Sequence, residues 1–167
     1  MGNILKRVPN IFYSISATTR KPRNGERDGV DYFFRAKGQF EEEIEAGSFL
    51  EWAKVYGDFY GTPIGPIADA LEGGAIVILE IDVQGAMQVK ERVGSDAVYL
   101  FIAPPSVEEL ARRLGSRKTE EADQIQKRME TAVEELRYAD RYDAVIVNDD
   151  LERATDELAR LLANARR

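Results

Sequence analysis

The chain of 167 residues contains neither cysteine nor histidine. Without cysteine it can form no disulfide and offers no thiolate, which excludes a disulfide-stabilised fold and cysteine-based catalysis. Without histidine it lacks a common catalytic base and zinc ligand, so any bound metal is expected to be a hard ion such as Mg²⁺ held by oxygen atoms.

Long hydrophobic runs are also missing. No apolar stretch approaches the roughly 20 residues of a membrane-spanning helix, and residues 1–7 carry no secretory signal pattern. Hydrophobic residues make up 44% of the chain and charged residues 32%, so we expect neither a disordered chain nor a membrane protein. These features are typical of a cytoplasmic protein with one domain and, at this length, a small insertion.

Acidic residues outnumber basic ones, 30 to 23, so the net charge is −7. The chain therefore lacks the broad basic surface of a general nucleic-acid-binding protein. Cations nevertheless gather in two short clusters, which are Arg20, Lys21, Arg23 and Arg27, and Arg112, Arg113, Arg117 and Lys118. Each cluster is either a site for a small polyanion or a group of solvated surface charges, which contribute little to stability.

The order of apolar segments predicts an α/β fold. Three apolar runs without alternation are typical of strands buried on both faces of a parallel sheet. These runs are residues 75–82, 98–103 and 143–147. Helices are expected between and after them, with Ser106 and Glu109 forming a capping box and Asp149 or Asp150 capping the last helix.

The segment from about 23 to 62 interrupts this alternation and is predicted to be a β-rich insertion. A short strand is expected at 31–34, after an earlier one at 12–16, and a helix from Gln39 to Ala46. The aromatic stretch 49–60 predicts a β-hairpin that turns at Gly57 and Asp58.

Arg20 and Arg23 stand three residues apart in a loop rich in turn-forming residues. Their guanidinium groups could converge on one phosphate, because planar donors bind phosphate oxygens in pairs. Tyr32 and Tyr60 offer hydroxyl groups that could reach the same anion. The alternative is that the arginines are solvated and the tyrosines are interior rings with exposed hydroxyls.

Five groups of motifs together resemble the guanylate kinase family, in the order in which that family carries them. They are Ser14–Arg20 with Pro22 and Arg23, Phe49–Ala53 with Tyr60–Thr62, Leu79–Gly85, Phe101–Ser106, and Ile146–Leu151. The resemblance extends from about residue 8 to the C-terminus. It implies a parallel sheet core like that of P-loop NTPases (1–22, 63–103 and 139–167), a small mixed-β GMP-binding insertion (about 23–62) and a helical lid (about 104–138).

The same resemblance implies ATP-dependent phosphorylation of GMP to GDP with Mg²⁺. GMP would be bound by Ser16, Arg20, Arg23, Tyr32, Glu51, Tyr60, Thr62 and Glu80. Arginines of a closing lid can neutralise charge during phosphoryl transfer. This role would fall to Arg113, Arg117 and Arg128. Asp82 would act in catalysis and organise Mg²⁺ indirectly. Asn148 would contact ATP.

Glu51 lies between Leu50 and Trp52, as an acid in an aromatic strand. Its carboxylate could accept two parallel hydrogen bonds from guanine, one from the ring N–H and one from the exocyclic amine. Adenine cannot offer that pair, so a buried Glu51 would be left partly unpaired against it, which would give base selectivity. The alternative is a solvent-facing position on an edge strand.

Glu80 and Asp82 end an apolar run, at the side of an α/β sheet where ligands bind. Two acids one residue apart on a strand point to opposite faces, so they need not share a role. The alternative is that both merely mark where the strand leaves the core. Gly85, which follows them, allows a close approach of the backbone.

The loop G-x-x-x-x-G-K-[ST], with which such enzymes hold the phosphates of ATP, is absent from the sequence. Because residues 4–10 resemble the end of the helix that follows this loop, we expect an N-terminally truncated chain that binds ATP weakly or not at all. Its activity is then in doubt. The alternative is a catalytically inactive guanylate-kinase-like module that binds GMP or phosphorylated peptides.

A missing first strand would leave a gap of roughly 10 Å, two strand spacings, between the strands at 75–81 and 98–103. Unpaired backbone groups would line this gap. We expect that the two strands pair directly, that another chain fills the gap by self-association, or that the sheet is disturbed. No nucleic-acid or membrane partner is expected.

Overall fold

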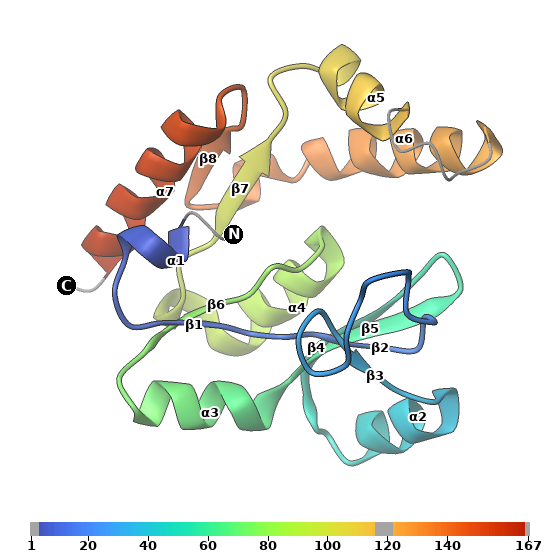
Figure 1. Ribbon diagram of the computed structural model, residues 1–167. Helices are drawn as coiled ribbons and strands as arrows, with labels where there is room; N and C mark the ends of the chain where they lie inside the picture. Colours follow the sequence, from blue (N-terminus) through green and yellow to red (C-terminus); the bar gives the residue numbers. More distant parts are fainter. Residues whose placement is uncertain (1–3, 116–121, 166–167) are drawn as a thin grey trace. The chain divides into compact units, whose positions relative to one another are not determined.

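The computed structural model describes residues 4–115 and 122–165 (Figure 1). The chain divides into two compact units. One unit is Pro9–Gly94, here called the 9–94 unit, and the other combines Met1–Val8 with Ser95–Arg167, here called the terminal unit. These units do not coincide with the predicted core (1–22, 63–103 and 139–167), insertion (about 23–62) and lid (about 104–138), and that division stays a prediction.

The 9–94 unit contains two sheets and three helices. Its strands are β1 (Ile11–Tyr13), β2 (Ala17–Thr18), β3 (Phe33–Phe34), β4 (Phe49–Val55), β5 (Asp58–Pro63) and β6 (Ile76–Ile78). Its helices are α2 (Lys37–Glu45), α3 (Ile64–Glu72) and α4 (Val83–Val93). Strands β1 and β6 form a parallel pair, and the other four form a mixed sheet in the order β3-β2-β5-β4.

The predicted hairpin is the β4–β5 pair of the mixed sheet. It turns at Tyr56 and Gly57, one residue earlier than predicted, because Asp58 already pairs with Val55. Both turn residues have positive φ, 52° for Tyr56 and 100° for Gly57. Glycine adopts such an angle without strain. Behind the sheet, the fully buried ring of Phe40 in α2 stacks on rings from β4 and β5, which anchors the helix that the sequence predicted.

The segment before helix α4 corrects one prediction. Strand β6 covers only Ile76–Ile78, whereas the apolar run predicted a strand over 75–82. The side chain of Asp82 accepts a hydrogen bond from the Gly85 amide at 2.8 Å and caps α4, so the chain leaves the sheet before Glu80. The opposite-face argument for the two acids is therefore wrong, because neither is a strand residue.

The terminal unit contains the remaining elements. They are α1 (Ile4–Arg7), β7 (Leu100–Ala103), α5 (Val107–Gly115), α6 (Ala122–Leu136), β8 (Ala144–Val147) and α7 (Leu151–Ala165), with 3₁₀ turns at Gly94–Asp96, on the boundary, and Ala139–Arg141. Strands β7 and β8 pair in parallel. The caps are confirmed at Ser106, which accepts the Glu109 amide at 3.2 Å, and at Asp150, which accepts the Arg153 amide at 2.9 Å. The carboxylate of Glu109 binds Arg112 and Arg113, so the described residues show only the Ser106 half of the predicted capping box.

The α/β fold is confirmed; among the described residues, the strands outside the mixed sheet form two parallel pairs, β1–β6 and β7–β8, and β2 also pairs in parallel with β3 inside that sheet. The strands at 75–81 and 98–103 belong to different units, so the three outcomes expected for the gap between them stay predictions. In the ranges that the structure describes, no helix has the length and apolar character needed to cross a membrane.

Candidate functional site

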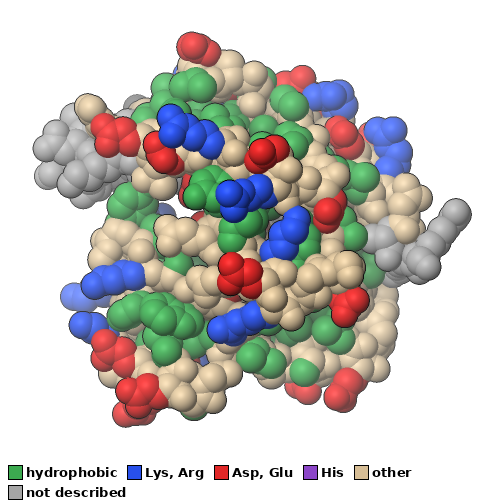
Figure 2. Space-filling model, turned by 180° about the vertical axis from the view of Figure 1, so that it is seen from behind, with side chains coloured by type: hydrophobic (Ala, Val, Ile, Leu, Met, Phe, Trp, Pro, Cys, Tyr) green, Lys and Arg blue, Asp and Glu red, His purple; other side chains and the backbone are tan. Residues whose placement is uncertain are grey.

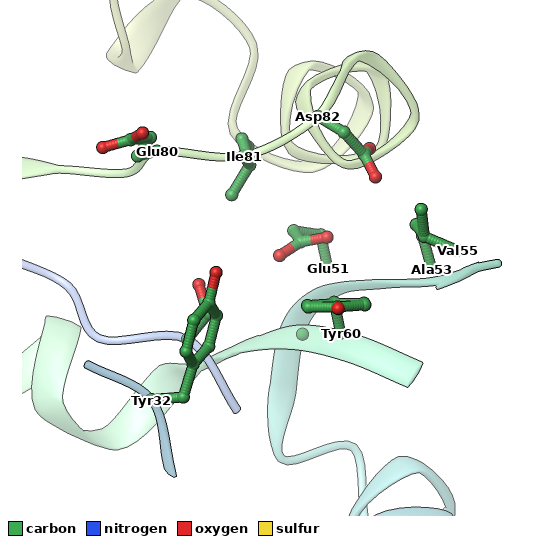
Figure 3. A pocket seen from close by; sticks show the side chains of 10 residues that line it. Tyr32, Glu51, Ala53, Val55, Tyr60, Glu80, Ile81 and Asp82 are labelled. Carbon is green, nitrogen blue, oxygen red and sulfur yellow. The ribbon is translucent and has the colours of Figure 1, made fainter. Parts of the chain in front are cut away.

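A pocket of about 220 Å³ lies within the 9–94 unit (Figure 3). Strands β4 and β5 form one wall, and the 80–82 segment that leads into α4 forms the opposite wall. Six residues that the sequence assigned to the site line this pocket: Ser16, Tyr32, Glu51, Tyr60, Glu80 and Asp82. Ala53, Val55 and Ile81 add apolar lining, so the pocket offers a flat ligand both hydrophobic contact and polar partners.

Glu51 is the buried acid of this pocket, with 5% of its surface exposed. It faces the pocket together with Ala53, two residues later on β4, whereas Trp52 between them packs against the Phe40 cluster on the other face of the sheet. The hydroxyl of Thr62, its cross-strand partner, donates to Oε1 at 2.5 Å. Burial raises the pKa of Glu51, the Thr62 hydrogen bond lowers it, and the negative charge of Asp82 raises it again.

Burial excludes the alternative that Glu51 faces solvent, although β4 is an edge strand of the mixed sheet. Thr62 is itself buried, with 1% exposed, and its hydroxyl serves Glu51. Its predicted contact with a ligand stays a prediction.

A second group of predicted residues surrounds Arg20. The guanidinium of Arg20 lies 5.3 Å from the ring centroid of Tyr32, and the ring centroids of Tyr32 and Tyr60 are 6.1 Å apart. Both Nη atoms of Arg20 donate to the carboxylate of Glu26, at 3.0 and 2.9 Å. These hydrogen bonds raise the pKa of Arg20, and the hydroxyl of Tyr60 acts in the same direction.

Arg23 lies in the same loop and is exposed. Its backbone amide donates to Glu26 at 2.7 Å, so one carboxylate is held by both predicted phosphate ligands. Glu26 was not predicted as a site residue. An acid three residues after Arg23, inside a basic cluster, was the available signal.

The two remaining pocket acids have different local partners. Glu80 is exposed and accepts a hydrogen bond from the hydroxyl of Tyr13, the last residue of β1, at 2.8 Å. Burial raises the pKa of Tyr13 above its usual range, and the bond to Glu80 adds to that effect. Asp82 caps α4, as described above. Tyr13 gave no sequence signal, because it reads as an ordinary strand aromatic.

The predicted catalytic residues of the terminal unit are described only in part. Arg113 in α5 donates from Nε to Glu109 at 2.7 Å and from Nη2 to the backbone oxygen of Asn148 at 2.9 Å, so two predicted residues touch. Arg112 and Arg113 lower the pKa of Glu109 to about 2. Arg128 belongs to α6, and Arg117 lies outside the described residues.

Comparison with known proteins agrees with this fold. The family model described as guanylate kinase matches residues 2–165. Guanylate kinases of Desulfitobacterium hafniense (strain Y51) and Carboxydothermus hydrogenoformans are 46% and 52% identical over 159 residues, which cover 95% of this chain and 79% and 78% of theirs. The crystal structure of guanylate kinase from Anaplasma phagocytophilum matches with a TM-score of 0.83 at 36% identity, over 96% of this chain and 79% of that chain.

The fold and these matches place the chain among the α/β phosphotransferases. The chain belongs to the guanylate kinase family, as its motifs indicated.

Proposed function

We propose that the pocket of the 9–94 unit binds GMP as the acceptor of a phosphoryl group from ATP. Buried Glu51 is the observation that carries this proposal. An ionised carboxylate inside a pocket needs hydrogen-bond donors, and Thr62 supplies one of them. The ring N–H and exocyclic amine of guanine would supply two more in parallel, whereas adenine presents an acceptor where guanine carries the ring N–H.

The phosphate of GMP would lie at the Arg20 end of the pocket. The rings of Tyr32 and Tyr60 lie beside Arg20, and both tyrosines line the pocket. Glu26 holds the Arg20 fork in the structure, so an incoming phosphate would compete with this carboxylate or share Arg20 with it. A phosphate dianion carries more charge and more acceptor oxygens than a carboxylate, which favours the exchange. Arg23, in the same loop, would add a second guanidinium.

Phosphoryl transfer would proceed by positioning and charge neutralisation, with no covalent enzyme intermediate. The pocket would hold the GMP phosphate in place, and Arg113, Arg117 and Arg128 would offset the charge of the transferred group. Mg²⁺ would neutralise phosphate charge. No group of three or more acidic residues suited to caging a metal exists within the described ranges, so Asp82 would act through water and phosphate oxygens, as Mg²⁺ sites commonly do.

This chain supplies few residues for the phosphates of ATP. The sequence contains no Gly-Lys-Ser or Gly-Lys-Thr, so the usual phosphate-binding loop is not available from this chain. Asn148 would contribute on the ATP side. We therefore expect GMP binding to be stronger than ATP binding in a protein of this sequence.

Calorimetry with GMP, AMP and a phosphoserine peptide tests the proposal. We expect GMP to bind at least tenfold more tightly than AMP, because only guanine offers Glu51 two donors. Equal weak binding of all three ligands would instead indicate a general phosphate pocket, the phosphopeptide-binding alternative. A coupled assay for ADP formation from ATP and GMP measures transfer separately.

A further inference from the structure

The outer edge of β4 is held by helix α4. Strand β4 is last in the order β3-β2-β5-β4, which leaves the backbone groups on its other side to be satisfied elsewhere. Gln88 of α4 satisfies two of them: its Oε1 accepts the Trp52 amide at 3.3 Å, and its Nε2 donates to the Trp52 oxygen at 2.8 Å. This two-bond exchange resembles the pattern between hydrogen-bonded residues of antiparallel strands.

Arg92, one helical turn after Gln88, holds β4 on the other side of Glu51. Its Nη1 donates to the backbone oxygens of Phe49 at 3.0 Å and Leu50 at 2.7 Å. The pairing of β4 with β5 shifts register between Phe49 and Glu51, and such irregularities re-aim neighbouring side chains. Arg92 thus binds the strand at its irregular point, and Gln88 binds it just after Glu51.

Gly85, one turn before Gln88, approaches the carboxylate itself. A Cβ atom at this position would lie 2.5 Å from Oε2 and 3.0 Å from Cδ of Glu51, closer than real Cβ contacts occur. Alanine would be the better helix former here, so helix stability does not explain the glycine. The carboxylate of Glu51 therefore rests against the backbone of α4, at a place where only hydrogen fits.

We propose that this face of α4, formed by Gly85, Gln88 and Arg92, sets base selectivity by fixing the orientation of the Glu51 carboxylate. The inference rests on the proposed function, in which Glu51 binds guanine. Two parallel hydrogen bonds require the carboxylate plane to match the edge of the base within about 10–20°. None of the three residues lines the pocket, so they are positioning residues that act through Glu51.

The ratio of the dissociation constants of IMP and GMP tests this role. IMP keeps the sugar, the phosphate and the ring N–H of GMP but lacks the exocyclic amine, so the ratio reports one hydrogen bond to Glu51. For the unmodified chain we expect a ratio of about 10 to 100, the range of a hydrogen bond to a charged group. Gln88→Ala and Arg92→Met should lower the ratio at least fivefold, and Arg92→Lys should restore part of it.

Gly85→Ala is the sharpest variant, because it should displace the carboxylate without weakening the helix. We expect the ratio to fall at least fivefold and the melting temperature to fall as well, because the added Cβ forces the buried carboxylate away from its place. Gln84→Ala is the matched control: Gln84 has the same side chain as Gln88, lies one turn earlier on α4 and is exposed. Its ratio should stay within twofold of the unmodified chain.

The outcomes separate the two proposals. If the unmodified chain shows no preference for GMP over IMP and AMP, the proposed function fails. If it prefers GMP but Gly85→Ala, Gln88→Ala and Arg92→Met weaken GMP and IMP equally, the helix has a structural role only, and the inference about α4 is overturned.

Discussion

The two units use their charged side chains in different ways. In the 9–94 unit, Glu51 and Arg20 are brought beside residues from distant elements around one cavity. In the terminal unit, Arg112 pairs with Glu109 on the same helix and Arg153 with Asp149 four residues earlier, whereas Arg7 of α1 pairs with Glu152 and Asp156 of α7 away from any described pocket. Acidic and basic side chains are interspersed on the face shown in Figure 2. Cation-rich segments therefore indicate a binding site only where tertiary contacts bring in partners from elsewhere.

Because of this difference, GMP binding and phosphoryl transfer can be tested with separate sets of variants. The residues proposed to bind GMP all belong to the 9–94 unit, whereas the arginines proposed to assist transfer belong to the terminal unit. Changes in one unit should then alter GMP affinity, and changes in the other should leave it unchanged.

Arg20→Met should have the largest effect. It removes the guanidinium that we propose for the GMP phosphate, and charge-assisted bonds to phosphate are strong. We expect GMP affinity to fall roughly 100-fold in calorimetry, and guanosine affinity to change less than twofold. Arg27→Met, in the same loop and exposed, is the control and should leave both affinities unchanged. An equal loss of GMP and guanosine would mean that Arg20 maintains the loop instead.

Glu51→Gln should have the next largest effect, a loss of base selectivity. The amide can accept one hydrogen bond where the carboxylate accepts two, and its NH₂ group opposes a donor of guanine. We expect the preference for GMP over AMP to fall by about tenfold or more in the same titrations. A retained preference would show that guanine is selected elsewhere in the pocket.

The same variant should be more stable than the unmodified chain at neutral pH. Burial raises the pKa of Glu51 in the folded state above its value of about 4.5 in the unfolded chain. The folded chain then binds more protons between these two pKa values, so stability falls as pH rises through that window and stays lower above it. Urea unfolding should show the advantage of Glu51→Gln at pH 7–8 and its disappearance below about pH 4.5. An advantage that grows on acidification would contradict this assignment.

Much of the fold follows from local sequence signals. The caps at Ser106 and Asp150, the helix closed before Gly47 and the β4–β5 hairpin all depend on neighbouring residues, and the structure has them. The boundary of β6 was wrong because Asp82 begins a helix where the apolar run continues. Hydrophobicity alone cannot detect that competition.

The site was predictable to a smaller extent. Five of the six predicted pocket residues lie in the family motifs, and the sixth, Tyr32, was implied by the resemblance as a whole. Gln88 and Arg92 were not identified, because each acquires its role only through a contact that folding creates, whereas Glu26 had a local signal in its position after Arg23. Gln88 and Trp52 are 36 residues apart along the chain, and the periodicity of apolar residues cannot predict a contact over that separation.

Arg113→Met tests the terminal unit. The change removes bonds to Glu109 and to the Asn148 oxygen, which tie α5 to the end of β8. We expect the free energy of unfolding to fall by about 1 kcal/mol and GMP affinity to stay within twofold. Where ATP turnover is measurable, kcat should fall at least tenfold with KM for GMP unchanged. Arg112→Met, which loses only the Glu109 contact, should have the smaller effect on stability; a matching loss of GMP affinity would argue against separable units.

Asp82→Asn should have the smallest effect on stability, and Asp82 is informative because one carboxylate carries two proposed roles. It caps α4, and asparagine caps helices about as well as aspartate, so Asp82→Asn should leave the melting temperature unchanged. Asp82→Ala should lower stability by about 1 kcal/mol through loss of the cap. If the charge of Asp82 organises the phosphates, both variants should reduce transfer alike, although only one is destabilised. Transfer that follows stability instead, intact in Asp82→Asn and reduced in Asp82→Ala, would assign Asp82 to the helix alone.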